Sequence, residues 1–285
     1  MSPDWRRRRV LLAGAALTLP LRARATHPLR VLAPDAGEQT RAIVSAILQR
    51  HPGSVRIDAP AAGAAPIVGL GPAALRLALA AGVDAPYLQL FVASSTYREI
   101  AGERGPSAIH AEASPFAQMR VVRALYGRRA VVMALSTRRS AAQLALLRAA
   151  AEEFGLQLAS EAVDEAEHPT RALARMAGDV LVALPDSSIY TPETLRPLLE
   201  ATYRRGVGLI GFTESMVSAG AIAAPIATID DILDHADELL EEPRARRVEY
   251  PQYWRVVYND RVARSLGITI DATDRALGRP GRTRR

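Results

Sequence analysis

Cysteine and lysine are both absent from this chain of 285 residues. Without cysteine the chain forms no disulfide, binds no metal through a thiolate and has no cysteine nucleophile. All of its basic side chains are therefore arginine, which we attribute to coding bias rather than to function. Histidine is scarce and shows no HExxH-like spacing, so we predict no metal site; the histidines are His27, His51, His110, His168 and His235.

The composition is that of a globular protein of one or two domains with a sizeable core, because 49% of the residues are hydrophobic and 23% are charged. Much of the net charge of +6 lies in residues 1–25, which carry six arginines and one aspartate. Their removal would leave about +1, with no basic stripe and interleaved aromatics in the body of the chain. We therefore predict no nucleic-acid partner, and we expect the arginine-rich tail 272–285 to be disordered.

The first 25 residues have the three parts of an export signal. Residues 6–9 form a basic n-region, residues 10–21 an apolar stretch, and residues 23–25 an A-x-A cleavage site. The apolar stretch is too short to span a bilayer. We predict a signal peptide of the Sec or twin-arginine type and a periplasmic protein, with an uncleaved membrane anchor as the alternative.

From residue 26 onwards, short apolar runs alternate with helical patterns. In the first half, strands are predicted at 29–33, 55–57, 66–71 and 87–93. One predicted helix begins with a capping box of Asp35 and Glu38, and another at 72–81 ends at Gly82. Strands separated by helices pair in parallel through right-handed crossovers.

The second half repeats this plan. It has predicted strands at 130–135, 156–160, 179–184 and 207–212. A helix capped by Ser140 with Gln143 is predicted to end at Gly155. Further helices are predicted at 170–176 and near 194, the latter with a kink or a start near Pro197, and at 229–240, capped by Thr228 and Asp231. The predicted fold class is α/β, with two Rossmann-like lobes built on parallel sheets.

Small polar residues follow four of the predicted strands. In open α/β sheets, ligands bind beyond the carboxyl ends of the strands, where helix N-termini offer unpaired N–H groups. Capping of the following helix is the alternative role for these serines and threonines, and Glu214 has the same alternative. The predicted ligand-binding residues are Ser94, Ser95, Thr96, Ser136, Thr137, Asp186, Ser187, Tyr190, Thr213, Glu214 and Ser215.

Signatures of enzymes and of nucleotide binding are missing or incomplete. The turn at 69–72 is neither a GxGxxG motif nor a P-loop, so we predict no nucleotide cofactor. Residues 211–215 depart from the GxSxG motif of serine hydrolases, with Thr213 in place of serine and Ser215 in place of glycine. Asp186 and Glu214 could form a carboxylate pair, but no catalytic partner accompanies them. We expect a protein that is not an enzyme.

The C-terminal third carries motifs in a recognisable order. GFTESMVSAGAIAA at 211–224 is followed by the capped helix, by VEYP at 248–251 and by YNDRVARSLGITI at 258–270. In this order, and in an ending formed by Asn259, Ala263, Leu266 and Gly267, the chain resembles the ABC transporter substrate-binding protein family, whose better-known members serve aromatic amino acid importers.

The resemblance implies a type I periplasmic binding protein fold, in which three crossover segments join two lobes around a small ligand. On this basis lobe 1 covers 26–112 and returns at about 225–247, and lobe 2 covers 113–224 and returns at about 248–271. The chain departs from the family pattern at 95–97, where an Asp-Pro loop is usual, and at 136–139, where the family usually has Asn-Pro.

The predicted function is that of an exported solute-binding protein of an ABC-type importer. Its predicted partners are a small polar or amino-acid-like ligand, held in a cleft between the lobes, and a membrane permease. Two alternatives remain open: an exported sensor that reports the same ligand to a membrane protein, and an exported hydrolase.

Overall fold

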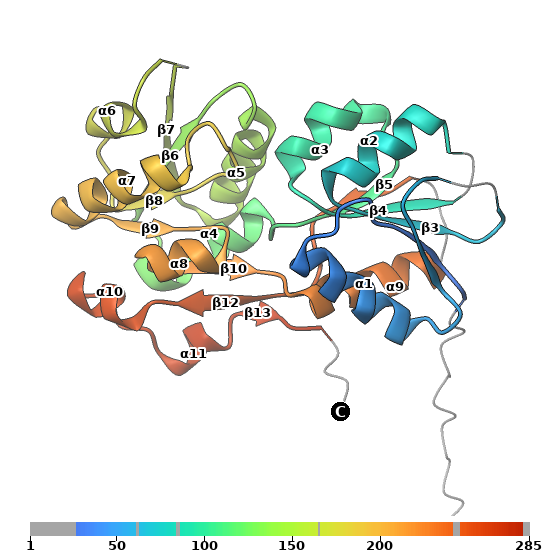
Figure 1. Ribbon diagram of the computed structural model, residues 1–285. Coiled ribbons are helices and arrows are strands. Elements are labelled where there is room, and N and C mark those ends of the chain that lie inside the picture. Colours follow the sequence, from blue (N-terminus) through green and yellow to red (C-terminus); the bar gives the residue numbers. More distant parts are fainter. Residues whose placement is uncertain (1–26, 61–62, 84–85, 165, 242–245, 282–285) are drawn as a thin grey trace, which may run out of the picture.

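The computed structural model describes residues 27–60, 63–83, 86–164, 166–241 and 246–281, and Figure 1 shows two lobes side by side. The predicted signal peptide, residues 1–25, lies outside the described residues. Among those that are described, no helix is both long and apolar enough to cross a membrane.

Lobe 1 is built on a six-stranded sheet in the order β11-β5-β4-β3-β1-β2. Every neighbouring pair in it is parallel. The strands are β1 (Arg30–Leu32), β2 (Val55–Ile57), β3 (Ile67–Leu70), β4 (Tyr87–Val92), β5 (Ser107–His110) and β11 (Val248–Glu249). The helices are α1 (Glu38–Arg50), α2 (Gly71–Ala81), α3 (Ser94–Ala101) and α9 (Ile229–Glu241), with a short 3-10 turn, η1, at Gly102–Arg104.

Two helical layers cover the sheet of lobe 1 (Figure 1). The apolar stripes of α1 and α9 pack on one face, where Ile47 and Ile232 meet Val31 and Leu90. On the opposite face, α2 and α3 bury Leu75 and other side chains against β4 and β5. Because both faces are covered, β3 is apolar and buried along its whole length, as is usual for a strand inside a parallel sheet.

Lobe 2 is built on a seven-stranded sheet in the order β13-β12-β10-β9-β8-β6-β7. Pairing is parallel from β10 to β7, and antiparallel at the edge formed by β10, β12 and β13. The strands are β6 (Val131–Ser136), β7 (Gln157–Ala162), β8 (Val180–Val182), β9 (Gly208–Ile210), β10 (Ala223–Ile226), β12 (Trp254–Tyr258) and β13 (Gly278–Arg279).

The helices of lobe 2 also lie on both faces of their sheet. One core contains Val121 of α4 and Leu147 of α5, and the other contains Leu173 of α6, Leu198 of α7 and Met216 of α8. The helix bounds are α4 (Pro115–Tyr126), α5 (Ala141–Phe154), α6 (Pro169–Ala174), α7 (Pro192–Arg204), α8 (Glu214–Ala219), α10 (Asp260–Ser265) and α11 (Ala272–Arg275). The predicted α/β class with two lobes on parallel-dominated sheets is confirmed.

Three connections carry the chain between the two sheets: β5 to α4, β10 to α9 and β11 to β12. The first and third lie side by side, because the ring of His110 packs edge-on against Tyr250 with centroids 5.0 Å apart. On its other side His110 meets Tyr97 of α3, at 5.6 Å. This aromatic cluster lies where the two connections leave lobe 1.

Three local expectations are wrong. No side chain caps α1, which begins after Gly37, so the predicted capping box of Asp35 and Glu38 does not form among the described residues. Helix α7 starts at Pro192, after a capping box of Thr191 and Thr194, and not near Pro197; the alternative of a kink at Pro197 stays a prediction. Residues 272–281 of the expected disordered tail form α11 and β13, since β13 pairs with β12. The sequence patterns also missed β5, α4, β10 and β12.

We predict that His110 makes stability pH-dependent. Burial, together with the charge of Arg98, lowers the pKa of His110 to about 4, while an unfolded histidine titrates near 6.5. Between these two pH values His110 is protonated in the unfolded chain but neutral in the folded chain. The free energy of unfolding therefore falls as the pH drops from about 6.5 to about 4. The His110→Phe variant keeps a ring in the cluster and should lose on the order of 3 kcal/mol of this pH dependence.

The measurement is urea unfolding at a series of pH values. The exposed His27 provides the matched control, since His27→Phe should keep the wild-type slope. His235, whose pKa burial also lowers, accounts for a residual slope in the His110→Phe variant. If that variant shows the full wild-type slope, His110 does not titrate as described.

Candidate functional site

Helices α3 and α5 face each other where the lobes meet, and each begins just beyond a strand end of its own lobe (Figure 1). Helix α3 follows strand β4 in the chain, and α5 follows β6. The contacting residues come from both lobes, and we call this set the seam: Ser94, Ser95, Glu99, Arg139, Ser140 and Gln143.

Gln143 of α5 joins the lobes inside the seam. Its side chain is 1% exposed, and its amide is hydrogen-bonded to the Ser94 hydroxyl at 2.8 Å. In the amide orientation that satisfies both ends, Ser95 N donates to the Gln143 oxygen at 2.9 Å and the Gln143 nitrogen donates to Ser140 O at 3.3 Å. One buried amide thus connects the first turn of α3 with the start of α5.

Two further contacts complete the seam. At its solvent edge the Arg139 guanidinium pairs with the Glu99 carboxylate at 2.6 Å, with both side chains about half exposed. On the inner side Ser94 N donates to the Glu112 carboxylate at 2.9 Å, and the Ser94 hydroxyl bonds the same group. Burial raises the pKa of Glu112, and the bonds from Ser94 offset part of that rise. Glu112 lies in the first connection between the lobes, so the seam and this connection are directly linked.

Asp186 organises the start of α5 from the end of β8. Its carboxylate is 2% exposed and accepts from the Thr137 hydroxyl at 2.6 Å, the Ser140 hydroxyl at 2.7 Å and Ser188 N at 2.9 Å. Burial alone would raise the pKa of Asp186, but these hydrogen bonds outweigh it and lower the pKa. Ser140 therefore does not cap α5 as expected, since its hydroxyl is turned to Asp186.

Gln118 of α4 ties together the ends of two strands of lobe 2. Its buried side-chain nitrogen donates to Ala183 O at 2.8 Å and to Gly211 O at 3.1 Å, just beyond β8 and β9. These bonds satisfy two carbonyl groups where the parallel ladder stops, which an apolar side chain could not do.

The remaining predicted residues lie at the predicted strand ends but outside these contacts. Ser136 is buried at the end of β6, Thr96 is half-buried in the first turn of α3, and Ser187 is exposed. Tyr190 packs edge-on against Phe212 with centroids 6.1 Å apart, and its buried hydroxyl finds no partner among the described residues.

The stretch Thr213–Ser215 starts α8. Thr213 caps this helix, because its hydroxyl accepts from Met216 N at 3.3 Å and lies 2.9 Å from the Ser215 hydroxyl. Glu214 is exposed in the first turn. For Thr213 the capping alternative therefore holds, and ligand binding by Glu214 and Ser215 stays a prediction.

Sequence patterns brought Ser94, Ser95, Thr137 and Asp186 together correctly as strand-end residues, although their ligand-binding role stays a prediction. They missed other members of the site: Glu99, Glu112, Gln118 and Arg139, together with the seam role of Ser140 and Gln143. The sequence does contain an SxxQ pattern at 140–143, but this pattern is typical of a helix cap and does not indicate a contact between lobes.

Two cavities are described, and neither is lined by any of the predicted ligand-binding residues. One, of about 390 Å³, lies beside α2 near Tyr87 and Arg104. The other, of about 420 Å³, lies between α1, α9 and the end of β13. Within the described residues, no group of three or more His, Cys, Asp or Glu side chains suits a metal ion.

No protein-family model matches the chain, and no curated protein matches it. Solved structures do. A Streptococcus pneumoniae protein described as an ABC domain in complex with L-Trp has 18% identity and a TM-score of 0.57, covering 86% of this chain and 97% of its own. A substrate-binding protein with adhesive properties from Clostridium difficile, in its ligand-free, open form, has 13% identity and a TM-score of 0.61, covering 87% of this chain and 96% of its own.

A conserved domain protein from Vibrio cholerae is similar at the same level, with 17% identity, a TM-score of 0.55, and coverage of 88% of this chain and 99% of its own. At these identities the likeness shows the fold alone. The fold of this chain is that of type I periplasmic binding proteins, as the resemblance to ABC transporter substrate-binding proteins predicted.

We predict that Asp186→Asn destabilises the protein by about 3 kcal/mol near neutral pH, because a charged acceptor of two hydroxyl donors is lost. The folded pKa of Asp186 lies below the unfolded value of about 3.9, so its stabilisation is complete above that value and is lost as the pH falls through the folded pKa. The gap between the variant and wild type should therefore close below about pH 4.

Urea unfolding across acidic pH measures this gap. Glu214→Gln removes a carboxylate that is exposed, so it should leave stability unchanged within about 0.5 kcal/mol. A gap between wild type and Asp186→Asn that stays constant down to the lowest pH would show that the charge of Asp186 is not what holds Thr137 and Ser140.

Proposed function

We propose that the protein is an exported solute-binding protein that closes around a small polar or amino-acid-like ligand and presents it to the permease of an ABC importer. The observation that carries the proposal is the seam itself, in which Ser94 and Ser95 of lobe 1 bond directly to the buried amide of Gln143 of lobe 2. Contacts of this kind exist only when the lobes are together, so they bias the equilibrium between open and closed forms.

Helix N-termini favour a carboxylate on the ligand. Helices α1 and α2 follow β1 and β3 of lobe 1, and among the described residues no side chain caps either of them. Their first N–H groups and positive dipole ends therefore suit an anionic group. Both chain segments begin beyond the carboxyl ends of the sheet strands, where α/β proteins bind ligands.

Asp186 has a different role from Glu214 in this proposal. The carboxylate of Asp186 already accepts three hydrogen bonds, so we assign it to positioning Thr137 and Ser140 rather than to contact with the ligand. The exposed carboxylate of Glu214 stays available for an ammonium group of the ligand. An amino-acid-like ligand would satisfy both preferences.

The mechanism needs no covalent step. Separation of α3 from α5 breaks the bonds of Gln143 and the Glu99–Arg139 pair, and the three connections act as the hinge. Closure removes water from the polar groups at the seam. A ligand that contacts both lobes binds the closed form more tightly than the open form, and this difference in affinity favours closure. The closed surface is then what a permease would recognise.

We predict that a ligand raises the melting temperature of the purified protein in a thermal-shift screen of amino acids, organic acids and related metabolites. With the best ligand, Gln143→Ala should weaken the apparent affinity by about tenfold, because the closed form loses a buried bridge worth about 1.5 kcal/mol. Calorimetry measures the affinity, and solution scattering measures closure.

Arg148→Ala is the matched control, because Arg148 lies on the same helix and bonds Ser160 within lobe 2. It should leave both affinity and closure unchanged. A flat response across a broad ligand panel would contradict solute binding. An affinity that Gln143→Ala leaves intact would contradict closure through the seam.

A further inference from the structure

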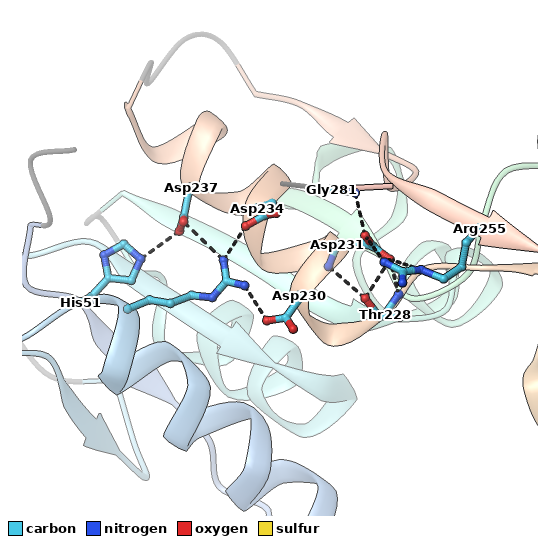
Figure 2. A network of polar contacts seen from close by, with 9 residues as sticks. His51, Thr228, Asp230, Asp231, Asp234, Asp237, Arg255 and Gly281 are labelled. Carbon is cyan, nitrogen blue, oxygen red and sulfur yellow. Dashed lines mark hydrogen bonds and ion pairs between the residues drawn. The ribbon is translucent and has the colours of Figure 1, made fainter. Parts of the chain in front are cut away.

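The cavity between α1, α9 and the C-terminal edge of lobe 2 lies apart from the seam and joins both lobes. Its volume is about 420 Å³, which is within the range of small-molecule sites. Its charged lining consists of Arg50, Asp230, Asp231, Asp234 and Arg255, and Figure 2 shows the ion pairs among them.

Arg50 fills one side of this cavity and is committed to three aspartates of α9. Its guanidinium donates to Asp234 Oδ1 at 2.7 Å and to Asp230 Oδ1 at 2.5 Å, and lies 3.6 Å from Asp237 Oδ2. The Arg50 side chain is 7% exposed, so its positive charge is matched where it lies and is not offered to a ligand.

Asp231 is equally committed, and it ties the two lobes together. Arg255 of β12 donates to both of its carboxylate oxygens, at 2.9 and 3.0 Å, and Gly281 N donates to Oδ1 at 2.9 Å. The Thr228 hydroxyl donates to Oδ2 at 2.7 Å. Figure 2 shows these groups meeting around Asp231, with lobe 2 contributing Arg255 and Gly281.

Asp234 differs from its neighbours, because one of its oxygens has no donor. The residue is 3% exposed, Oδ1 is bound by Arg50, and Oδ2 is buried without a hydrogen-bond partner. A buried carboxylate oxygen without a donor costs free energy. Gly281 packs close to this oxygen, since a Cβ atom added at Gly281 would lie 2.7 Å from Asp234 Oδ2, and Asp234 and Gly281 both line the cavity.

The charge of the lining indicates what this oxygen would accept. Three aspartates and two arginines line the cavity, which leaves one negative charge in excess. Within the described residues no cluster suits a metal ion, so an organic donor fits better. A primary ammonium is a compact point charge with three N–H donors, and the carboxylate of Asp230 and the carboxamide of Gln49 line the same cavity as further acceptors.

We propose that this cavity binds the primary ammonium group of a small organic cation, with Asp234 Oδ2 as its principal acceptor. Because α1 and α9 belong to lobe 1, whereas Arg255 and Gly281 continue the sheet of lobe 2, a cation bound here stabilises the junction between the lobes. The site is separate from the seam and takes a different ligand from the one proposed there.

The experiment titrates the full chain with butylammonium and with 1,4-diaminobutane near neutral pH, with butan-1-ol and potassium chloride as controls at matched ionic strength. The amines should raise the melting temperature saturably, by about 2 °C or more, and the controls should not. In calorimetry, Asp234→Asn should weaken amine binding at least about tenfold, because a charge-assisted bond is lost.

Three further variants control for misfolding and for binding elsewhere. Gly281→Ala keeps every charge and places a methyl group against Asp234 Oδ2, so it should also weaken amine binding. Asp58→Asn, an equivalent substitution at an exposed aspartate outside the cavity, should leave it unchanged. Gln143→Ala, which removes the bridge in the seam, should also retain amine binding.

The outcomes separate this proposal from the proposed function. Amine binding that both Asp234→Asn and Gly281→Ala weaken, with Asp58→Asn and the seam variant unaffected, supports the cavity site. No saturable response to either amine overturns it. Binding that the cavity variants retain, or that the seam variant alone abolishes, places the amine elsewhere and also overturns it, without deciding whether the seam binds a solute.

Discussion

The buried carboxylate of Asp186 is the constraint on which the site depends. By accepting from Thr137 and Ser140 it fixes the turn that leads from β6 into α5. That turn carries Arg139 and Gln143 toward lobe 1, where they meet Glu99 and the first turn of α3. Asp186 therefore acts on the site without contacting a ligand, because its carboxylate positions the groups that bridge the lobes.

Junctions on different elements hold the two lobes together. In the seam the polar groups bridge strand ends through Gln143, whereas at the C-terminal edge Asp231 of α9 is held by Arg255 and Gly281. The aromatic cluster around His110 lies between the crossing segments. A motion that opens the seam must either preserve or rearrange the contacts of Asp231 and of the aromatic cluster. A ligand in the seam and a ligand in the cavity would therefore both influence the equilibrium between open and closed lobes.

Local patterns predicted most of the lobe architecture. Apolar runs followed by capped amphipathic segments indicated alternating strands and helices, and the helix ended by Gly82 is found as predicted, since a left-handed C-cap favours glycine. The sequence patterns missed β5 and β12, because strands of four and five residues show little periodicity. They also missed α4, although Ser114 followed by Pro115 is a standard signal for a helix start.

The sequence by itself determined the α/β class, the two-lobe plan and the polar residues at four strand ends, because these follow from local periodicity and from the rule that parallel strands end at one edge. Only the tertiary structure decided which of them meet. Asp186 finds Thr137 across 49 positions, and Arg50 finds Asp234 across 184. Side-chain partners at such separations depend on how whole sheets and helices pack, which no local pattern contains.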